Sequence, residues 1–247
     1  MNGFEEIAVR MPEPYRLLWR ESVFSTNDEL RALAENGMSE GLVFVADEQS
    51  AGRGRRGAEW FSPKGESLAF SILLRPKQEK VFWPRLSLIA GLAVAEALEK
   101  FIPLAEIKWP NDVMIGGKKV AGILVEAGRD FVIVGIGINV NTVNFPEGLN
   151  ATSLLLERGE KVLREEVLLG VVDKLARHLL RTETGFKEIV AAVNERCFLS
   201  GHKVALTSAD KRREGLVKGI GVGGELLLDS DGWTEAIFQA DEVRILG

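Results

Sequence analysis

The sequence predicts an α+β fold in which a mixed, mainly antiparallel sheet with helices is followed by a small all-β barrel. Three observations lead to this prediction. Apolar runs of strand length are interspersed with helical patterns, short turns join several of the strands, and only short strands follow Phe198. We therefore divide the chain into a larger unit, residues 1–197, and a C-terminal unit, residues 198–247.

The larger unit begins with strands and helices in alternation. Ser25 or Thr26 can cap a helix that ends at Asn36-Gly37, and apolar residues at a 3.6-residue period predict a core-facing helix over 82–101. Strands are expected at the compact apolar runs 17–24, 41–46 and 68–74.

Turn residues connect the next strands, so we expect these strands to be antiparallel neighbours. Two amphipathic helices, over 163–180 and 186–193, complete the larger unit. The turn-connected strands are 107–109, 119–126 and 131–140, and those of the predicted barrel are 203–207, 215–221, 225–228 and 235–238.

Composition excludes several classes of protein. With 46% hydrophobic and 27% charged residues the chain is an ordinary globular one, and its net charge of −5 speaks against a bulk polyanion ligand. The single Cys197 excludes a disulfide framework, and His178 and His202 are too far apart to suggest a metal pair. No signal peptide and no uninterrupted apolar run of about 18 residues is present, so we expect a soluble cytoplasmic protein without membrane contact.

The segment Gly52-Arg-Gly-Arg-Arg-Gly57 places three arginines among glycines in an acidic chain. Glycine lets the backbone approach a ligand, and arginine suits phosphate or carboxylate. We reject a dinucleotide-binding fold because no helix is expected after Gly57. A solvated basic loop, or an arginine-glycine contact to nucleic acid, stays open as the alternative.

Three further segments carry polar groups at strand ends. Asn111-Asp112 follows Lys108-Trp-Pro and either presents a carboxylate for nucleotide-bound Mg²⁺ or forms an Asx turn. Lys119 begins an apolar strand in which alternation sets it on the face opposite Gly122, and it is either a ligand-binding charge or a hairpin-end lysine in solvent. The alternating glycines of Gly135-Ile-Gly-Ile-Asn139 mark a close approach by a ligand, or a bulge or tight packing.

Together these segments resemble the biotin protein ligases (biotin–[acetyl-CoA-carboxylase] ligases). The resemblance runs from about Leu18 to the C-terminus, and the strings that carry it are Ser25-Thr-Asn27, Gln49-Ser-Ala-Gly-Arg-Gly-Arg-Arg-Gly57, Lys108-Trp-Pro-Asn-Asp112, Lys119-Val-Ala-Gly-Ile-Leu-Val-Glu126 and Gly137-Ile-Asn139. It implies a catalytic core related to class II aminoacyl-tRNA synthetases, followed by an SH3-like domain. Only about twenty residues precede the catalytic pattern, so we expect no DNA binding.

The resemblance also implies the reaction. Biotin attacks the α-phosphate of MgATP to give biotinyl-5′-AMP and pyrophosphate, and a lysine of a biotin carboxyl carrier protein then attacks the acyl-adenylate. Because an anion approaches a polyanion, cations must offset the repulsion, which is the role that we expect of the arginines and Lys119. No enzyme nucleophile is needed, so Cys197 is expected to be structural.

Site residues are carried over from the family position by position. Biotin contacts are implied for Ser25, Thr26, Asn27, Gln49, Gly52, Arg53, Gly54, Arg55, Lys119 and Gly122. Contacts to ATP or the adenylate are implied for Arg53, Arg55, Trp60, Asn111, Asp112 and Asn139, with Arg55, Lys119 and Asp112 catalytic and Asp112 a Mg²⁺ ligand.

We further expect the 52–60 loop to be mobile until an anion arrives, since it holds like charges among glycines. Three alternatives rank lower: a lipoate–protein ligase, a nucleic-acid-binding module and a non-catalytic sensor of biotin or adenylate. The oligomeric state stays open, with a homodimer through an exposed sheet edge as one option.

Overall fold

The computed structural model describes residues 3–208, 211–230 and 232–246. Its centre is a seven-stranded sheet with the order β1-β2-β3-β7-β6-β5-β4, in which only β1 and β2 run parallel. This is the predicted mixed, mainly antiparallel sheet. The strands are β1 (Arg16–Val23), β2 (Leu42–Gln49), β3 (Ser67–Leu74), β4 (Glu106–Lys108), β5 (Asp112–Ile115), β6 (Lys118–Ala127) and β7 (Val132–Asn139).

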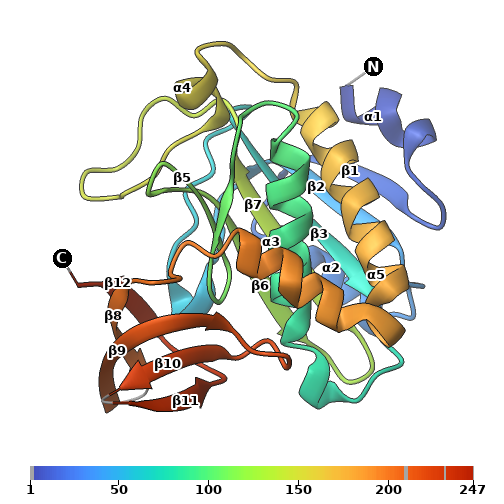
Figure 1. Ribbon diagram of the computed structural model, residues 1–247. Helices are drawn as coiled ribbons and strands as arrows, with labels where there is room; N and C mark the ends of the chain where they lie inside the picture. Colours follow the sequence, from blue (N-terminus) through green and yellow to red (C-terminus); the bar gives the residue numbers. More distant parts are fainter. Residues whose placement is uncertain (1–2, 209–210, 231, 247) are drawn as a thin grey trace.

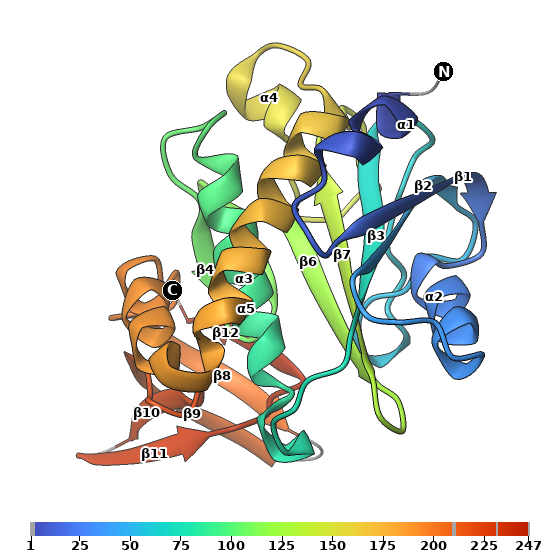
Figure 2. The same cartoon turned by 90° about the vertical axis from the view of Figure 1, so that its right-hand side faces the viewer.

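Helices cover both faces of this sheet (Figures 1 and 2). Helices α3 (Arg85–Leu98) and α5 (Arg164–Glu195) pack on one face, and α2 (Thr26–Glu35) packs on the other. The buried apolar residues accordingly form a large cluster on the α3 side and a smaller one beneath α2. The remaining helices, α1 (Gly3–Ile7) and α4 (Leu154–Arg158), are short, as are the 3-10 turns η1 (Ala8–Arg10), η2 (Arg55–Gly57) and η3 (Lys80–Phe82).

Helix α3 is buried almost all round. Among the described residues, only the helical segment Lys80–Leu98 has the length and composition for a membrane crossing, and 67% of its apolar window is buried inside the fold. Its side chains pack between the sheet and α5. We therefore assign it to the core, as its predicted apolar face requires.

The two helices predicted over 163–180 and 186–193 are confirmed: they are the two parts of α5, which meet at a kink where Gly185 has a non-helical backbone (φ −129°). One prediction about the strands is wrong. The strand around 107–109 and the strand around 119–126 are not neighbours, because β5 lies between them. Strand β5 has only four residues and begins at Asp112, so the sequence contains no separate apolar run that would predict it.

The C-terminal unit is a five-stranded antiparallel sheet with the order β11-β10-β9-β8-β12. The last strand was not predicted. Figure 1 shows the unit beside the end of the large sheet, below β5 and β6. Its strands are β8 (Lys203–Ser208), β9 (Lys211–Ile220), β10 (Leu226–Ser230), β11 (Trp233–Ile237) and β12 (Glu242–Ile245).

Hydrogen bonds join the two units. Trp109 Nε1 donates to the Gly224 carbonyl at 3.0 Å, and Arg85 Nε donates to the Gly223 carbonyl at 3.1 Å. The predicted division at residue 198 falls between α5 and β8. It stays a prediction about folding units, because the described contacts tie one unit to the other.

Candidate active site

A cavity of about 210 Å³ opens on the α2 face of the large sheet, between the sheet, the arginine loop (residues 52–57) and the C-terminal unit. It brings together most of the predicted site residues, which come from four separate stretches of sequence. Those that line it are Ser25, Thr26, Asn27, Gln49, Arg53, Gly54, Arg55, Trp60, Asn111, Asp112, Lys119 and Gly122. Two predicted residues, Gly52 and Asn139, lie outside its lining.

One end of the cavity is built from neutral polar groups. The Thr26 backbone N–H and hydroxyl both donate to Gln49 Oε1, at 2.8 and 3.0 Å. Ser71 Oγ donates to Asn27 Oδ1 at 2.6 Å and lies 2.8 Å from Thr26 Oγ1. Because every one of these side chains holds another, the end presents a fixed set of neutral donors and acceptors.

Helix α2 positions this end. Ser25 has the extended backbone of an N-cap residue, as predicted, although its side chain makes no capping bond. The first helical residues, Thr26 and Asn27, thereby face the sheet and are buried to 3% and 4% exposure. We call this set (Ser25, Thr26, Asn27, Gln49 and Ser71) the neutral end.

Glycines on β6 and β7 form the floor of the cavity. A methyl group at Gly135 would lie 2.3 Å from Asn27 Oδ1, and one at Gly137 would lie 2.3 Å from the Trp60 indole. At Gly122 it would lie 3.1 Å from both Trp60 and Lys119 Nζ. The alternating glycines therefore mark close approach, as predicted, and the groups that approach in this structure are the side chains of Asn27 and Trp60.

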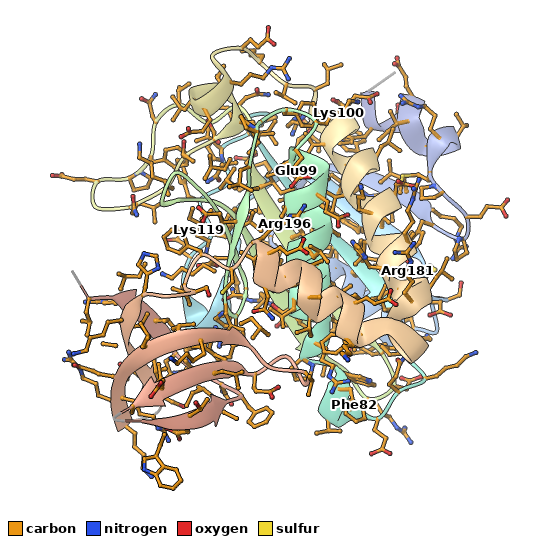
Figure 3. All side chains as sticks on the ribbon, in the orientation of Figure 1. Phe82, Glu99, Lys100, Lys119, Arg181 and Arg196 are labelled. Carbon is orange, nitrogen blue, oxygen red and sulfur yellow. The ribbon has the colours of Figure 1, made fainter. Side chains whose placement is uncertain are left out.

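The other end is charged, and Lys119 is its centre. Lys119 Nζ forms an ion pair of 2.6 Å with Asp112 Oδ1 and lies 5.6 Å from the centre of the Trp60 ring. Figure 3 shows Lys119 between the large sheet and the C-terminal unit. We call Arg55, Asn111, Asp112 and Lys119 the charged end.

Strand alternation gave the wrong face for Lys119. The register between β5 and β6 shifts, so that Met114 faces Lys119 while Val113 faces Ala121, which leaves Val120 as an extra residue. Such a bulge changes the side from which the following residues project. Lys119 consequently reaches the same side as Gly122, where it lines the cavity.

The arginine loop is a tight backbone hairpin. The Gly54 N–H donates to the Ala58 carbonyl at 2.6 Å, and the Trp60 N–H donates to the Gly52 carbonyl at 2.9 Å. Within the intervening 3-10 turn, Arg56 adopts a left-handed conformation (φ 57°), and Ala58 is already extended. The prediction that no helix follows Gly57 is confirmed, and with it the rejection of a dinucleotide-binding motif.

The three arginines have different partners. Arg53 is bound in bidentate fashion by Asp28, with Nη2 donating to Oδ1 at 2.7 Å, and Arg56 pairs with Asp241. Arg55 instead donates to two neutral groups, Asn111 Oδ1 at 3.2 Å and the Ala240 carbonyl at 2.8 Å.

These partners shift two pKa values. The hydrogen bond from Arg53 lowers the pKa of Asp28. Burial, followed by the nearby charge of Arg56, lowers the pKa of Arg55, which nevertheless stays a cation at neutral pH. The premise that the loop lacks partners until an anion arrives is therefore wrong, because carboxylates from outside the loop already hold it. Its mobility without ligand stays a prediction.

Asn111 and Asn139 hydrogen-bond to backbone carbonyls next to the charged end. Asn111 Nδ2 donates to the Ile123 carbonyl at 3.0 Å, which leaves its Oδ1 for Arg55. Asn139 Nδ2 donates to the Thr152 carbonyl at 3.0 Å and lies 3.4 Å from the Lys119 carbonyl. Asn139 thus fixes the backbone behind Lys119, and a direct contact to ligand stays a prediction.

A second hollow of about 580 Å³ adjoins the cavity across Trp60. Gln49, Glu59 and Trp60 border both spaces. The far wall of the hollow is the segment 146–149, and its near wall includes Gly52 and Phe61. The two spaces together form an extended site of which Trp60 is the partition.

Metal and nucleophile chemistry have few candidates. No group of three or more His, Cys, Asp or Glu residues suited to a metal is found within 3–208, 211–230 and 232–246. Burial raises the pKa of the Cys197 thiol, which lies in the turns after α5 and outside the cavity lining. This agrees with the structural role predicted for Cys197.

Sequence reasoning missed several residues of the site. Ser71 could have been found, because a hydroxyl in the apolar run of β3 needs a buried partner. Glu126 accepts from Asn27 Nδ2 at 2.6 Å and lies 3.5 Å from Arg53. Asp28, Ala240 and Asp241 gave no signal, since their roles depend on which distant segments meet.

Comparison with known proteins identifies the family. A family model described as the biotin/lipoate A/B protein ligase family matches residues 19–144. The bifunctional ligase/repressor BirA of Bacillus subtilis is 34% identical, over 91% of this chain and 73% of its own length. The chain belongs to the biotin/lipoate A/B protein ligase family. The predicted resemblance is thereby confirmed.

Further biotin ligases in this family match along most of their length. A biotin–[acetyl-CoA-carboxylase] ligase of Mycobacterium tuberculosis is 32% identical over 90% of this chain and 86% of its own. Among solved structures, a biotin protein ligase from Aquifex aeolicus in complex with biotin and ATP has a TM-score of 0.85 and 36% identity, over 93% of this chain and 99% of that one. This structural match confirms the predicted fold class.

Proposed function

We propose that the cavity joins biotin to ATP and that the chain, a biotin protein ligase, then passes the biotinyl group to a lysine of a biotin carboxyl carrier protein. One observation carries the assignment of the site. The hydrogen-bonded neutral end and the two cations of the charged end, Arg55 and Lys119, line the same cavity. Biotin has the same polarity, with a neutral ureido ring at one end and a carboxylate at the other.

At the neutral end, Thr26, Asn27 and Gln49 are suited to the ureido group. That group offers N–H donors and a carbonyl acceptor, and a buried site must satisfy each of them. Ser71 and Glu126 hold the side chain of Asn27 from below, at 2.6 Å in each case. The ring therefore meets side chains that need no rearrangement, and this saves ordering entropy on binding.

At the charged end, Arg55 and Lys119 receive the carboxylate and the α-phosphate. A carboxylate oxygen attacks the α-phosphorus, the bond from that phosphorus to the bridging oxygen breaks, and pyrophosphate leaves. Negative charge builds up on the phosphoryl oxygens during this step, and preorganised cations stabilise it. Asp112 keeps the Lys119 ammonium aimed into the cavity before substrate arrives.

The nucleotide needs the second hollow as well. Sites for small molecules usually enclose about 300–1,000 Å³, and the first cavity alone offers about 210 Å³. We place the purine end of ATP beyond Trp60, in the hollow bordered by residues 146–149. The indole of Trp60 then lies beside both halves of the biotinyl-adenylate.

Mg²⁺ enters this scheme with ATP. The ion takes most of its ligands from phosphates and water when it accompanies a nucleotide, so one carboxylate is enough on the protein side. Asp112 is the residue suited to that task, since its carboxylate lines the cavity at the charged end and one of its oxygens, Oδ2, is not the one paired with Lys119. The charge that the ion supplies would add to that of Arg55.

The second step needs no group on the enzyme to carry the acyl chain. The neutral amine of the carrier lysine attacks the acyl carbon of biotinyl-5′-AMP, the bond to the phosphate oxygen breaks, and AMP leaves. The enzyme has to keep water away from the mixed anhydride until that amine arrives. The arginine loop and Trp60 cover the space where the anhydride would lie.

The test is direct. We expect the full chain, incubated with biotin, MgATP and a biotin carboxyl carrier domain, to add one biotinyl mass to the acceptor lysine. Replacing that lysine by arginine in the carrier provides the matched control. An unmodified carrier, with no pyrophosphate released, would contradict the proposal, and modification by lipoate in place of biotin would favour the lipoate branch of the family.

Three expectations of the sequence accompany this function as proposals. We expect the enzyme to act in the cytoplasm, where its ATP is found. The net charge of −5 supports the expectation that it does not bind DNA. A homodimer stays an option, which sedimentation with and without biotinyl-5′-AMP would decide.

A further inference from the structure

The arginine loop is held at both of its ends by carboxylates that lie outside it. Arg53, before the turn, is bound by Asp28 of helix α2, and Arg56, within the turn, is bound by Asp241 of the C-terminal unit. Only Arg55, between them, has no carboxylate hydrogen-bonded to its guanidinium among the described contacts. The loop thus spans the cavity mouth between two structural units.

The contact at Asp28 ties the loop to the neutral end. Both carboxylate oxygens of Asp28 bond to the Arg53 guanidinium, which is the geometry in which an arginine pair is strongest. Glu126 lies 3.5 Å from the same guanidinium and accepts from Asn27. Asp28 itself directly follows Asn27 in α2, so the loop is fixed to the helix turn that forms the neutral end.

The contact at Asp241 ties the loop to the C-terminal unit. The Asp241 side chain is only 14% exposed, and the neighbouring Ala240 carbonyl accepts from Arg55 at 2.8 Å. Residues 240 and 241 lie between β11 and β12. This segment therefore fixes both the turn and the direction of the arginine that points into the cavity.

The three arginines of the loop differ in how their charges are balanced. Asp28 balances Arg53 and Asp241 balances Arg56, whereas Arg55 bonds to an amide oxygen and a carbonyl. An anionic ligand therefore meets one guanidinium that has no carboxylate directly hydrogen-bonded to it among the described contacts, and the flanking two hold the loop in place. We propose that Asp28 and Asp241 are positioning residues that keep the loop closed and so retain biotinyl-5′-AMP until the carrier lysine arrives.

This inference rests on the proposed function, and the rate at which preformed biotinyl-5′-AMP leaves the enzyme tests it. The labelled adenylate is bound to the full chain, an excess of unlabelled adenylate is added, and release is followed without carrier. We expect Asp28→Asn and Asp241→Asn each to release it about two- to fivefold faster, the range for a partly exposed ion pair. Glu35→Gln, which removes the same charge from the exposed end of α2, should match the wild type.

Two further measurements distinguish the loss of an ion pair that holds the arginine loop from a general loss of structure. Asp28→Glu, which keeps a carboxylate opposite Arg53, should restore slow release. Raising the salt concentration from about 0.1 to about 1 M screens exposed pairs, and should speed release from the wild type more than from Asp28→Asn.

The outcomes do not overlap with those for the function itself. Wild-type release rates in both Asn variants would overturn the inference, even if the wild type adenylates biotin normally. A wild type that releases no pyrophosphate from biotin and MgATP would instead overturn the function. Because the adenylate is supplied ready-made, a variant that no longer makes it still reports on its release.

Discussion

The two ends of the cavity are constructed in different ways. The neutral end comes from α2, β2 and β3, and its residues hydrogen-bond to one another. The charged end is assembled from β5, β6, the arginine loop and a carbonyl of the C-terminal unit. The neutral end is fixed by hydrogen bonds among its own side chains. The charged end depends on contacts with the arginine loop and the C-terminal unit.

The difference fits the roles that we propose for the two ends. A neutral ring is recognised by hydrogen bonds whose geometry must be set in advance, because each unsatisfied buried group costs binding energy. A reacting centre needs charge that is directed at the phosphate in the transition state. We expect changes at the charged end to affect the rate of adenylation, and changes at the neutral end to affect the affinity for biotin.

The largest effect is expected at Lys119. Lys119→Ala removes the ammonium that faces the reacting groups, so adenylation should slow by about 10²–10³-fold, as when other preorganised donors are lost. Pyrophosphate release with saturating biotin and MgATP measures this. Lys118→Ala, an exposed neighbour, is the control. A Lys119→Ala enzyme with a normal rate but weak biotin binding would erase the distinction between the ends.

Ser71→Ala should act on affinity. It leaves Asn27 Oδ1 without the donor at 2.6 Å, and an unsatisfied buried acceptor costs about 1–3 kcal/mol. Part of this cost should appear in urea unfolding and part as weaker biotin binding by calorimetry. Ser50→Ala, at an exposed position, should change neither. Unchanged binding together with a slower adenylation step would count against our division of the cavity.

The floor between the two ends can be tested by adding a methyl group. Gly137→Ala would place a carbon 2.3 Å from the Trp60 indole, whereas Gly122→Ala would place one 3.1 Å from it. Overpacking typically costs about 1–3 kcal/mol, and we expect Gly137→Ala at the upper end and Gly122→Ala at the lower. Thermal unfolding ranks the two, and the reverse order would show that Trp60 moves away at little cost.

The smallest expected effect is the loss of stability at high pH when Tyr15 ionises. Experiments on the charged end at alkaline pH need this as a control. Burial, followed by Glu40, raises the pKa of Tyr15 from 10.0 to about 12. A pKa raised by folding means that the neutral phenol contributes stability fully below pH 10.0, and that this contribution is lost as the pH rises to about 12.

Tyr15 is the only tyrosine in the chain, so the ultraviolet absorbance of tyrosinate reports this group in the native protein. Tryptophan fluorescence, followed in parallel, reports the intact fold. A midpoint near 10 while the fold persists would contradict the buried environment of Tyr15.

Sequence periodicity predicted most of the fold because burial imposes it. The apolar run of β7 and the apolar helical pattern of α3 were both expected, and both elements are buried almost completely. It failed for β5 and β12, each of which is four residues long and follows a turn. The break expected between 180 and 186 is present, since the backbone at Gly185 leaves the helical conformation and kinks α5.

For the site, motifs located the residues but not their partners. Lys119 was expected on the wrong face, because a bulge is a property of two strands in register and not of one. All three arginines were expected to offset the charge of the reacting anions, and the sequence did not show that two of them pair with Asp28 and Asp241. Charge alone could not distinguish them, since Asp241 follows Arg56 by about three quarters of the length of the chain.

The hydrogen bond from Trp109 to Gly224 has a consequence for how the chain can be cut or redesigned. Trp109 stands one proline before Asn111, and its indole is anchored in the C-terminal unit. A fragment that stopped at residue 197 would expose this apolar indole, now only 3% exposed, to water and would remove the carbonyl that accepts from Arg55. Asp241 and the Ala240 carbonyl thus belong to the surroundings of the candidate site, and the larger unit alone would lack both.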